Sequence, residues 1–361
     1  MVYQIAYQLN DYCSDRGLLS TQIGLVNSAL AGLAAVAVIV FAPLPHVLAV
    51  GLVPDTLLTP LSLAILWMTL QWIKQDGQFS LYQWIGLGLL FGLAGLSKYT
   101  AVLYAIAFVI ACLTVPRYSF LKQSGFYLAI AIALLLISPV ILWNAQHDWI
   151  SFKYQIDHGS GGTWLWRRVA AFIGLQIAVF GFLPLLGLWA FSSSVHWRTR
   201  PWIGILLIFF ALPFGVFAVL SGGGGLPHWT TPAWFCLAPI AGIGLAQWWQ
   251  SDKRWLIALF AAIQGTLVVT GLTLVMTAGY PIASHFKVNP LADLFGWRSA
   301  SIRANLLVNE LKASGIAVQN WTLASRVGWY AKPTPIYVLD DRLDQFDLWF
   351  GKLPEGSNVI L

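Results

Sequence analysis

Asp55 is the first residue of this chain whose type and position indicate a chemical role. It lies in residues 51–56, where a loop enters a hydrophobic stretch, and it is the only carboxylate between Asp15 and Asp76. An ionisable group at such a depth is costly and usually functional. The aspartate could also cap the helix that Pro54 begins, and the two roles are compatible.

Lys98 is the second candidate. It stands in a short polar break, residues 97–100, between two hydrophobic stretches. A lysine at this place could bind a phosphate group. Its aliphatic stem could instead lie along the protein while the ammonium reaches the lipid headgroups. The sequence leaves both interpretations open.

A third group of candidates lies in the loop between residues 144 and 168, namely His147, Asp148, His158, Arg167 and Arg168. The alternation of aromatic and polar residues is typical of an amphipathic helix at the membrane interface. That interpretation does not explain the histidines and acids in a chain with only 9% charged residues. We therefore expect at least one of them to face a substrate. The two arginines could bind a lipid phosphate or headgroup.

His228 is the last candidate, and it follows the four glycines at 222–225. The glycines predict a mobile or close-packed turn. No strand precedes them and no GK[ST] follows, so they do not form a nucleotide-binding loop. His228 could bind substrate or be structural. No metal-ligand spacing supports a zinc site, and a divalent metal ion stays open as a cofactor.

The composition places these residues in a membrane protein. Of the 361 residues 58% are hydrophobic, and the mean hydropathy is +0.72. A soluble domain carries about a quarter charged residues, so most of this chain must be solvated by lipid. Most of the net charge of +6 arises in residues 1–277, which hold 12 Lys and Arg and 7 Asp and Glu. Such an excess sets membrane orientation and does not indicate nucleic-acid binding.

The hydrophobic stretches predict an all-α polytopic bundle of about nine spans. Each is near the ~20 residues needed to cross the hydrocarbon core. They are residues 22–41, 56–73, 81–97, 100–115, 125–143, 169–191, 202–220, 229–249 and 255–277. When the loops are assigned alternately to the two sides, eight Lys and Arg fall on one side and four on the other. The richer side is predicted to be cytoplasmic together with the N-terminus, so every candidate residue faces outward.

The chain changes character after the last predicted span. We expect a transmembrane domain at 1–279 and a small extracytoplasmic α/β domain at 280–361. The pattern predicts a helix at 299–314, a strand at 317–323, a short helix and a strand at 335–339. Both ends of the chain resemble interrupted elements, and we expect both domains to be incomplete.

Several motifs together resemble a known family. They are Pro54-Asp55 at the start of a span, residues 92–100, Trp143-Asn144-x-x-His147-Asp148-Trp149-x-x-Phe152, His228-Trp229-x-x-Pro232-Ala233, and residues 293–297 and 345–349 of the tail. In order and spacing they resemble a bacterial glycosyltransferase of family 39, with the GT-C superfold. This family is related to protein O-mannosyltransferases and lipid A aminoarabinose transferases. The resemblance covers nearly the whole chain.

The resemblance implies an enzyme of the bacterial inner membrane that transfers a sugar from a polyprenyl-phosphate donor. The acceptor is a hydroxyl of a lipid, glycan or protein at the outer face. Asp55 resembles the family's acidic residue at the catalytic cavity, and Lys98, His147 and Asp148 resemble residues that line it. Positive charge or a metal ion would stabilise the leaving phosphate.

One departure from the family concerns its principal acidic pair, which lies in a long first outer loop. Asp11 and Asp15 fall on the opposite side and cannot replace that pair. We therefore expect either a fragment of a longer protein or an inactive copy, and we favour the fragment.

A secondary transporter, a lipid flippase and a non-catalytic membrane scaffold are the alternatives. A transporter predicts inverted repeats and polar residues near the middle of the membrane. Here the polar residues gather at one face and no repeat is visible. The transferase interpretation makes a geometric prediction, which is that Asp55, Lys98, His147 and His228 meet in one cavity.

Overall fold

The computed structural model of the protein describes residues 1–15, 26–113, 120–160, 163–192, 201–278, 285, 289, 291 and 294–361. The side chains of residues 13–15, 156–160 and 201 lie outside this description. The chain forms two compact units, residues 1–268 and 269–361, and each is described by itself.

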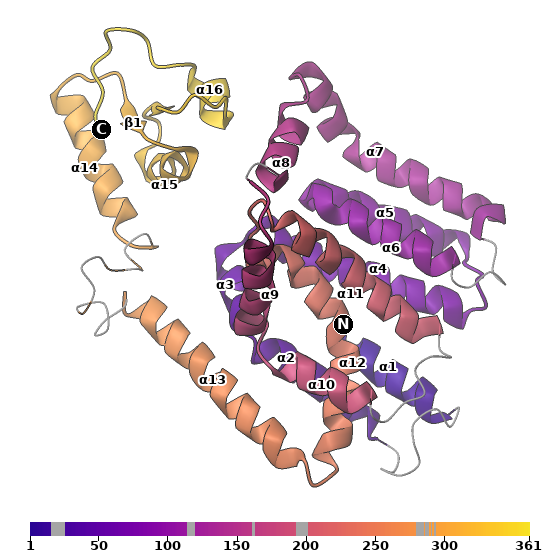
Figure 1. Cartoon of the computed structure of the whole chain (residues 1–361). Coiled ribbons are helices and arrows are strands. Elements are labelled where there is room, and N and C mark those ends of the chain that lie inside the picture. Colours follow the sequence, from indigo (N-terminus) through magenta and orange to yellow (C-terminus); the bar gives the residue numbers. More distant parts are fainter. Residues whose placement is uncertain are drawn as a thin grey trace. The chain divides into compact units, whose positions relative to one another are not determined.

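The first unit is helical (Figure 1). Its elements are α1 (Val2–Asp15), α2 (Ser28–Val40), α3 (Pro43–Gly51), α4 (Pro54–Lys74), α5 (Leu81–Ser97), η2 (Tyr99–Ala101), α6 (Val102–Leu113), η3 (Phe120–Lys122), α7 (Ser124–Gln146), α8 (Ile150–Ser160), α9 (Trp166–Phe180), α10 (Leu183–Ser192), α11 (Pro201–Leu220), η5 (Pro227–Thr230), α12 (Thr231–Trp249) and α13 (Arg254–Met276). The boundary between the units falls within α13, whereas the sequence predicts a change of domain after that helix.

Five helices in the described part of the chain are long and apolar enough to cross a membrane, and the number is up to seven if each of two bent helix pairs is one span. The bends measure 70° between α2 and α3 and 94° between α9 and α10. The 94° bend falls inside the predicted span 169–191, which is therefore not one straight helix, whereas the 70° bend follows the predicted span 22–41. The helices at Leu81–Ser97 and Tyr99–Leu113 are apolar but shorter. Nine spans stays a prediction, and the coarser conclusion is a helical, multi-pass membrane protein.

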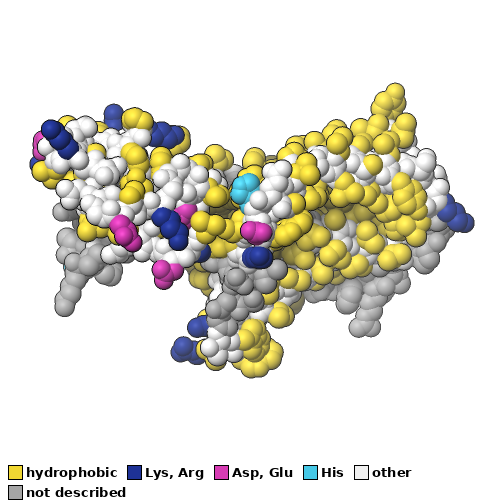
Figure 2. Space-filling view, turned by 90° about the horizontal axis from the view of Figure 1, so that it is seen from above, with side chains coloured by type: hydrophobic (Ala, Val, Ile, Leu, Met, Phe, Trp, Pro, Cys, Tyr) yellow, Lys and Arg dark blue, Asp and Glu magenta, His cyan; other side chains and the backbone are white. Residues whose placement is uncertain are grey.

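The exterior agrees with that conclusion. Figure 2 shows large continuous areas of hydrophobic side chains at the surface. The exposed hydrophobic side chains of this unit include Leu134 and Leu135 on α7 and Trp189 on α10. Such side chains are stable at the surface when lipid replaces water around them.

Helix α12 lies at the centre of the first unit, and nearly all its residues are buried. Small residues allow its neighbours to approach closely. A Cβ atom at Gly242 would meet Ala35 of α2, and one at Gly244 would meet the backbone of Gly187 on α10. Close backbone approach through Gly and Ala is the usual way in which helices pack within a membrane.

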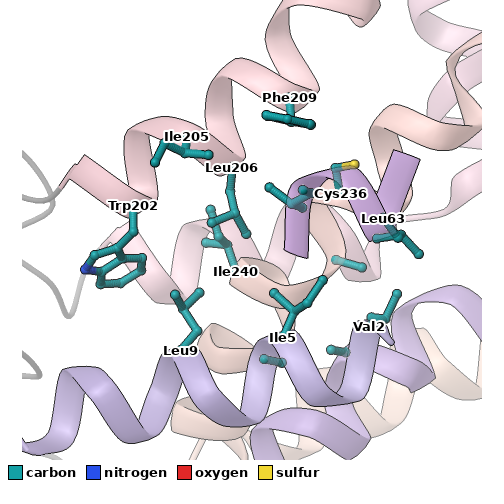
Figure 3. Packing of buried hydrophobic residues seen from close by; sticks show 14 of the residues in the cluster. Val2, Ile5, Leu9, Leu63, Trp202, Ile205, Leu206, Phe209, Cys236 and Ile240 are labelled. Atoms are coloured by element: carbon teal, nitrogen blue, oxygen red, sulfur yellow. The ribbon is translucent and has the colours of Figure 1, made fainter. Parts of the chain in front are cut away.

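Larger side chains fill the core around α12 (Figure 3). Ile5 and Leu9 from α1 point toward Leu206 of α11 and Ile240 of α12. All four are buried. This packing joins the N-terminal helix to the helices that carry the later part of the first unit.

Gln264 of α13 binds the backbone at both bends. Its Nε2 donates to the carbonyl oxygen of Phe41 at 3.1 Å, beside the break between α2 and α3. Its Oε1 accepts from the backbone amides of Phe182 and Leu183, each at 2.9 Å, beside the break between α9 and α10. Backbone groups freed at a bend inside lipid need such partners.

The second unit contains α14 (Trp297–Glu310), β1 (Ile316–Val318), α15 (Trp321–Ala331), β2 (Ile336–Val338) and α16 (Gln345–Phe350) (Figure 1). The two strands pair in parallel, with Ile316 opposite Ile336. The predicted strand at 317–323 is too long, because Asn320 caps α15 by accepting from the amide of Leu323. A side-chain cap at this position favours the helix over continuation of the strand.

Candidate functional site

Asp55 lies in the first turn of α4 and its side chain is 1% exposed. The N-cap residue of this helix is Val53, and no side chain caps the helix there. The alternative role of Asp55 as an N-cap is therefore wrong. Its negative charge still benefits from the helix N-terminus, where the aligned peptide dipoles favour an anion.

Lys98 supplies the partner of this carboxylate. Its Nζ donates to both oxygens of Asp55, at 2.8 Å to Oδ1 and 2.7 Å to Oδ2. Lys98 follows α5 in an extended conformation, so the helix ends where the lysine turns toward α4. The neighbouring Ser97 donates from Oγ to the carbonyl oxygen of Pro54 at 2.8 Å. Two adjacent residues thus bind the end of α5 to the start of α4.

His228 is the third member of the site. It lies in η5, with Nε2 at 3.7 Å from Oδ2 of Asp55. The side chains of Lys98 and His228 are 18% and 25% exposed, compared with 1% for Asp55. The carboxylate is therefore the buried member, and the lysine and histidine are the members that a ligand can reach.

Tyr99 connects this site to the corner between α7 and α8. Its ring stacks on that of Phe152 with centroids 4.7 Å apart. Its hydroxyl lies 2.8 Å from Oγ of Ser151, which in turn donates to Oδ1 of the buried Asn144. Since Ser151 uses its proton on Asn144, the hydroxyl of Tyr99 donates to Ser151. The first turn of α8 therefore holds the residue next to Lys98.

His147 and Asp148 lie in the same corner but make other contacts. The His147 ring stacks on Trp143 at 4.2 Å, and its Nδ1 lies 2.7 Å from the Trp143 carbonyl oxygen. Asp148 is exposed in a turn with φ of 52°. Within the described residues, neither one forms a hydrogen bond or an ion pair with Asp55. The expected convergence thus includes Asp55, Lys98 and His228, and leaves His147 at the end of α7.

The remaining predicted residues lie in and before α9. Arg168 donates from Nη1 to the carbonyl oxygens of Thr163 at 3.0 Å and Gly223 at 3.2 Å. Arg167 is exposed at the start of the helix. The side chain of His158 lies outside the described residues. A role of the arginines in binding lipid phosphate stays a prediction.

Tyr99, Ser151 and Asn144 lie in stretches that the sequence singled out, but no role in the site was predicted for them. Their signal is present but weak, because a buried asparagine near the end of an apolar helix must find partners for its amide. Such a residue indicates that a polar contact exists, but the sequence does not identify its hydrogen-bond partner. Among the described residues, no group of three or more His, Cys, Asp or Glu could hold a metal ion.

Comparison with known proteins gives one match. Residues 23–143 match the model of a family described as dolichyl-phosphate-mannose-protein mannosyltransferase. No curated protein and no solved structure matches the chain. The matched range includes Asp55 and Lys98 but ends before His228. The match supports a glycosyltransferase of the membrane type.

Proposed function

We propose that the protein is a membrane glycosyltransferase that moves a sugar from a polyprenyl-phosphate-linked donor to an acceptor hydroxyl. The acceptor would belong to a lipid, glycan or protein. Dolichyl phosphate, in the description of the matching family, is a lipid phosphate of this type. The resemblance of the motifs to bacterial family 39 enzymes supports the same donor class. No observation favours a transporter, a flippase or a scaffold.

The Asp55–Lys98–His228 cluster is the observation that carries the proposal. Asp55 is almost completely buried and both its oxygens bind Lys98. We therefore infer that Asp55 positions Lys98, and that Lys98 and His228 contact the donor phosphate. This revises the catalytic role predicted for Asp55, since a group enclosed in this way does not touch substrate.

The charges in the cluster fit a phosphate leaving group. A sugar phosphodiester carries one negative charge, and the ammonium of Lys98 and an N–H of the His228 ring can each donate a hydrogen bond to it. Transfer breaks the bond from the anomeric carbon to the phosphate oxygen and forms a bond to the acceptor oxygen, whose proton is lost. The departing phosphate gains a second negative charge. Donors already in position stabilise such developing charge more strongly than water does.

We further propose that the site faces the extracytoplasmic side of a bacterial inner membrane, with the N-terminus in the cytoplasm. The unequal distribution of Lys and Arg between alternate loops supports this orientation. A donor phosphate at the outer headgroup level would reach a cluster at the start of α4.

Binding of undecaprenyl phosphate to the purified full chain in lipid nanodiscs tests the proposal. Lys98→Ala and His228→Ala are each expected to weaken binding about tenfold, because each removes one charge-assisted hydrogen bond. Lys153→Ala is the matched control, since Lys153 is an exposed lysine of α8. Unchanged affinity in both site variants would overturn the assignment.

A further inference from the structure

Gln176 is a buried polar residue of α9, with 1% of its surface exposed. Its side chain forms hydrogen bonds with residues of one short segment. Its Oε1 accepts from Oγ1 of Thr230 and from Nε1 of Trp234, the latter at 3.0 Å. Its Nε2 donates to the carbonyl oxygen of Pro227 at 3.2 Å. These three partners stand on both sides of His228 in the sequence.

The segment that carries His228 needs such support. η5 has four residues, and Pro227 at its start has no backbone N–H to donate. A 3₁₀ turn of this length has poor hydrogen-bond geometry of its own. The position of the imidazole therefore depends on what η5 packs against, and α9 is one of its neighbours.

The residues just before and at the start of α9 hold the chain leading into η5. The amide of Leu165 donates to the Gly222 carbonyl oxygen at 2.9 Å, and Nε1 of Trp164 donates to that of Val219 at 2.8 Å. A Cβ atom at Gly222 would meet the Trp164 indole, so a glycine is needed there. The connection between α11 and η5 is thus bound at its beginning by this segment and at its end by Gln176.

We propose that Gln176 is a positioning residue that fixes His228 beside Asp55. It acts through Pro227, Thr230 and Trp234, and does not itself touch the ligand. The importance of this position for donor binding rests on the function proposed above. The placement of His228 by Gln176 does not rest on that function, because the hydrogen bonds that define it involve no ligand.

The first test measures the accessibility of the imidazole. Diethyl pyrocarbonate modifies exposed histidines, and mass spectrometry gives the rate at His228 in the purified full chain. Gln176→Met keeps the length of the side chain but removes its hydrogen bonds. We expect the rate to rise about tenfold, as loss of several buried hydrogen bonds frees the segment.

Gln264→Met is the matched control. Gln264 is also a buried glutamine with three hydrogen-bond partners, but these lie at the two helix bends. A general loosening of the fold would raise the His228 rate in both variants equally, and that outcome would overturn the proposal. If Gln176→Met does not fold, Thr230→Val removes one of the same bonds and is expected to raise the rate to a smaller extent.

The second test measures undecaprenyl phosphate binding in a double-mutant cycle. Gln176→Met is expected to weaken binding in the native background and to have no further effect when His228 is already alanine. Equal effects in both backgrounds would contradict action through His228. If His228→Ala leaves binding unchanged while Gln176→Met still exposes the imidazole, the proposed function fails and the positioning role stands.

Discussion

Lys98 and Asp55 form an ion pair whose carboxylate is buried. Removing one partner of such a pair lowers the stability more than removing both partners. Taking two charges out of water is costly, and their attraction offsets that cost only when the geometry is good. Here both oxygens of Asp55 accept from Nζ at 2.8 Å or less. A variant that removes the lysine alone leaves the buried carboxylate with only the His228 ring nearby, whose Nε2 lies 3.7 Å from Oδ2.

We expect Lys98→Met to lower the free energy of unfolding by about 3–5 kcal/mol, because the buried carboxylate loses the two short hydrogen bonds from Nζ. The double variant Asp55→Asn with Lys98→Met removes both charges and is expected to recover most of that loss. Thermal unfolding of the purified full chain measures both effects. The affinity of the double variant for undecaprenyl phosphate should remain lower than that of the native chain, since the double variant lacks the ammonium. A double variant no more stable than Lys98→Met would contradict the pairing.

The candidate site was partly predictable at the level of single residues. Asp55, Lys98 and His228 were identified because ionisable groups are rare beside apolar helices and therefore informative. His147 satisfied the same criterion, but it stacks on Trp143 four residues earlier. The sequence does not distinguish a histidine that faces a ligand from one that packs on its own helix. Gln176 was missed because a single amide in an apolar helix does not indicate its partners.

At the level of helices, hydrophobic length predicted where apolar segments lie but not where they bend. Prolines follow both bends, at Pro43 and Pro184, yet Pro60 and Pro139 lie inside helices that continue. Proline alone is therefore not diagnostic, since neighbouring groups can bind the backbone it frees. What distinguishes the two bends from the continuing helices is the hydrogen bonds with Gln264, a residue remote in sequence from both bends.

Gln264→Leu is expected to destabilise the first unit by several kcal/mol, at about 1–3 kcal/mol for each buried group left without a partner. The groups concerned are the amides of Phe182 and Leu183 and the carbonyl oxygen of Phe41. Hydrogen exchange at the two amides measures the effect directly. Gln250→Leu, at an exposed glutamine after α12, is the control. Retained protection of both amides in Gln264→Leu would contradict the role assigned to this side chain.

For the whole molecule, the order of the last two long helices constrains the side on which the site lies. α12 and α13 both meet the length and composition needed to cross a membrane. If each crosses once, the chain returns to the side from which it started. His228, just before α12, and the chain that follows α13 are then on the same side of the membrane, whatever the total number of spans. The connection at Asp252 is on the other.

Cysteine labelling with a membrane-impermeant maleimide checks this arrangement in a variant without native cysteines. Leu226→Cys and Lys352→Cys, both at exposed positions, are expected to react in spheroplasts. Asp252→Cys is expected to react only in inverted vesicles, because Lys253 and Arg254 beside it favour the cytoplasmic side. Labelling of Asp252→Cys and Lys352→Cys from the same side would mean that α13 does not cross. Labelling of Leu226→Cys only in inverted vesicles would put His228 on the cytoplasmic side, where the proposed site would not meet a donor in the outer leaflet.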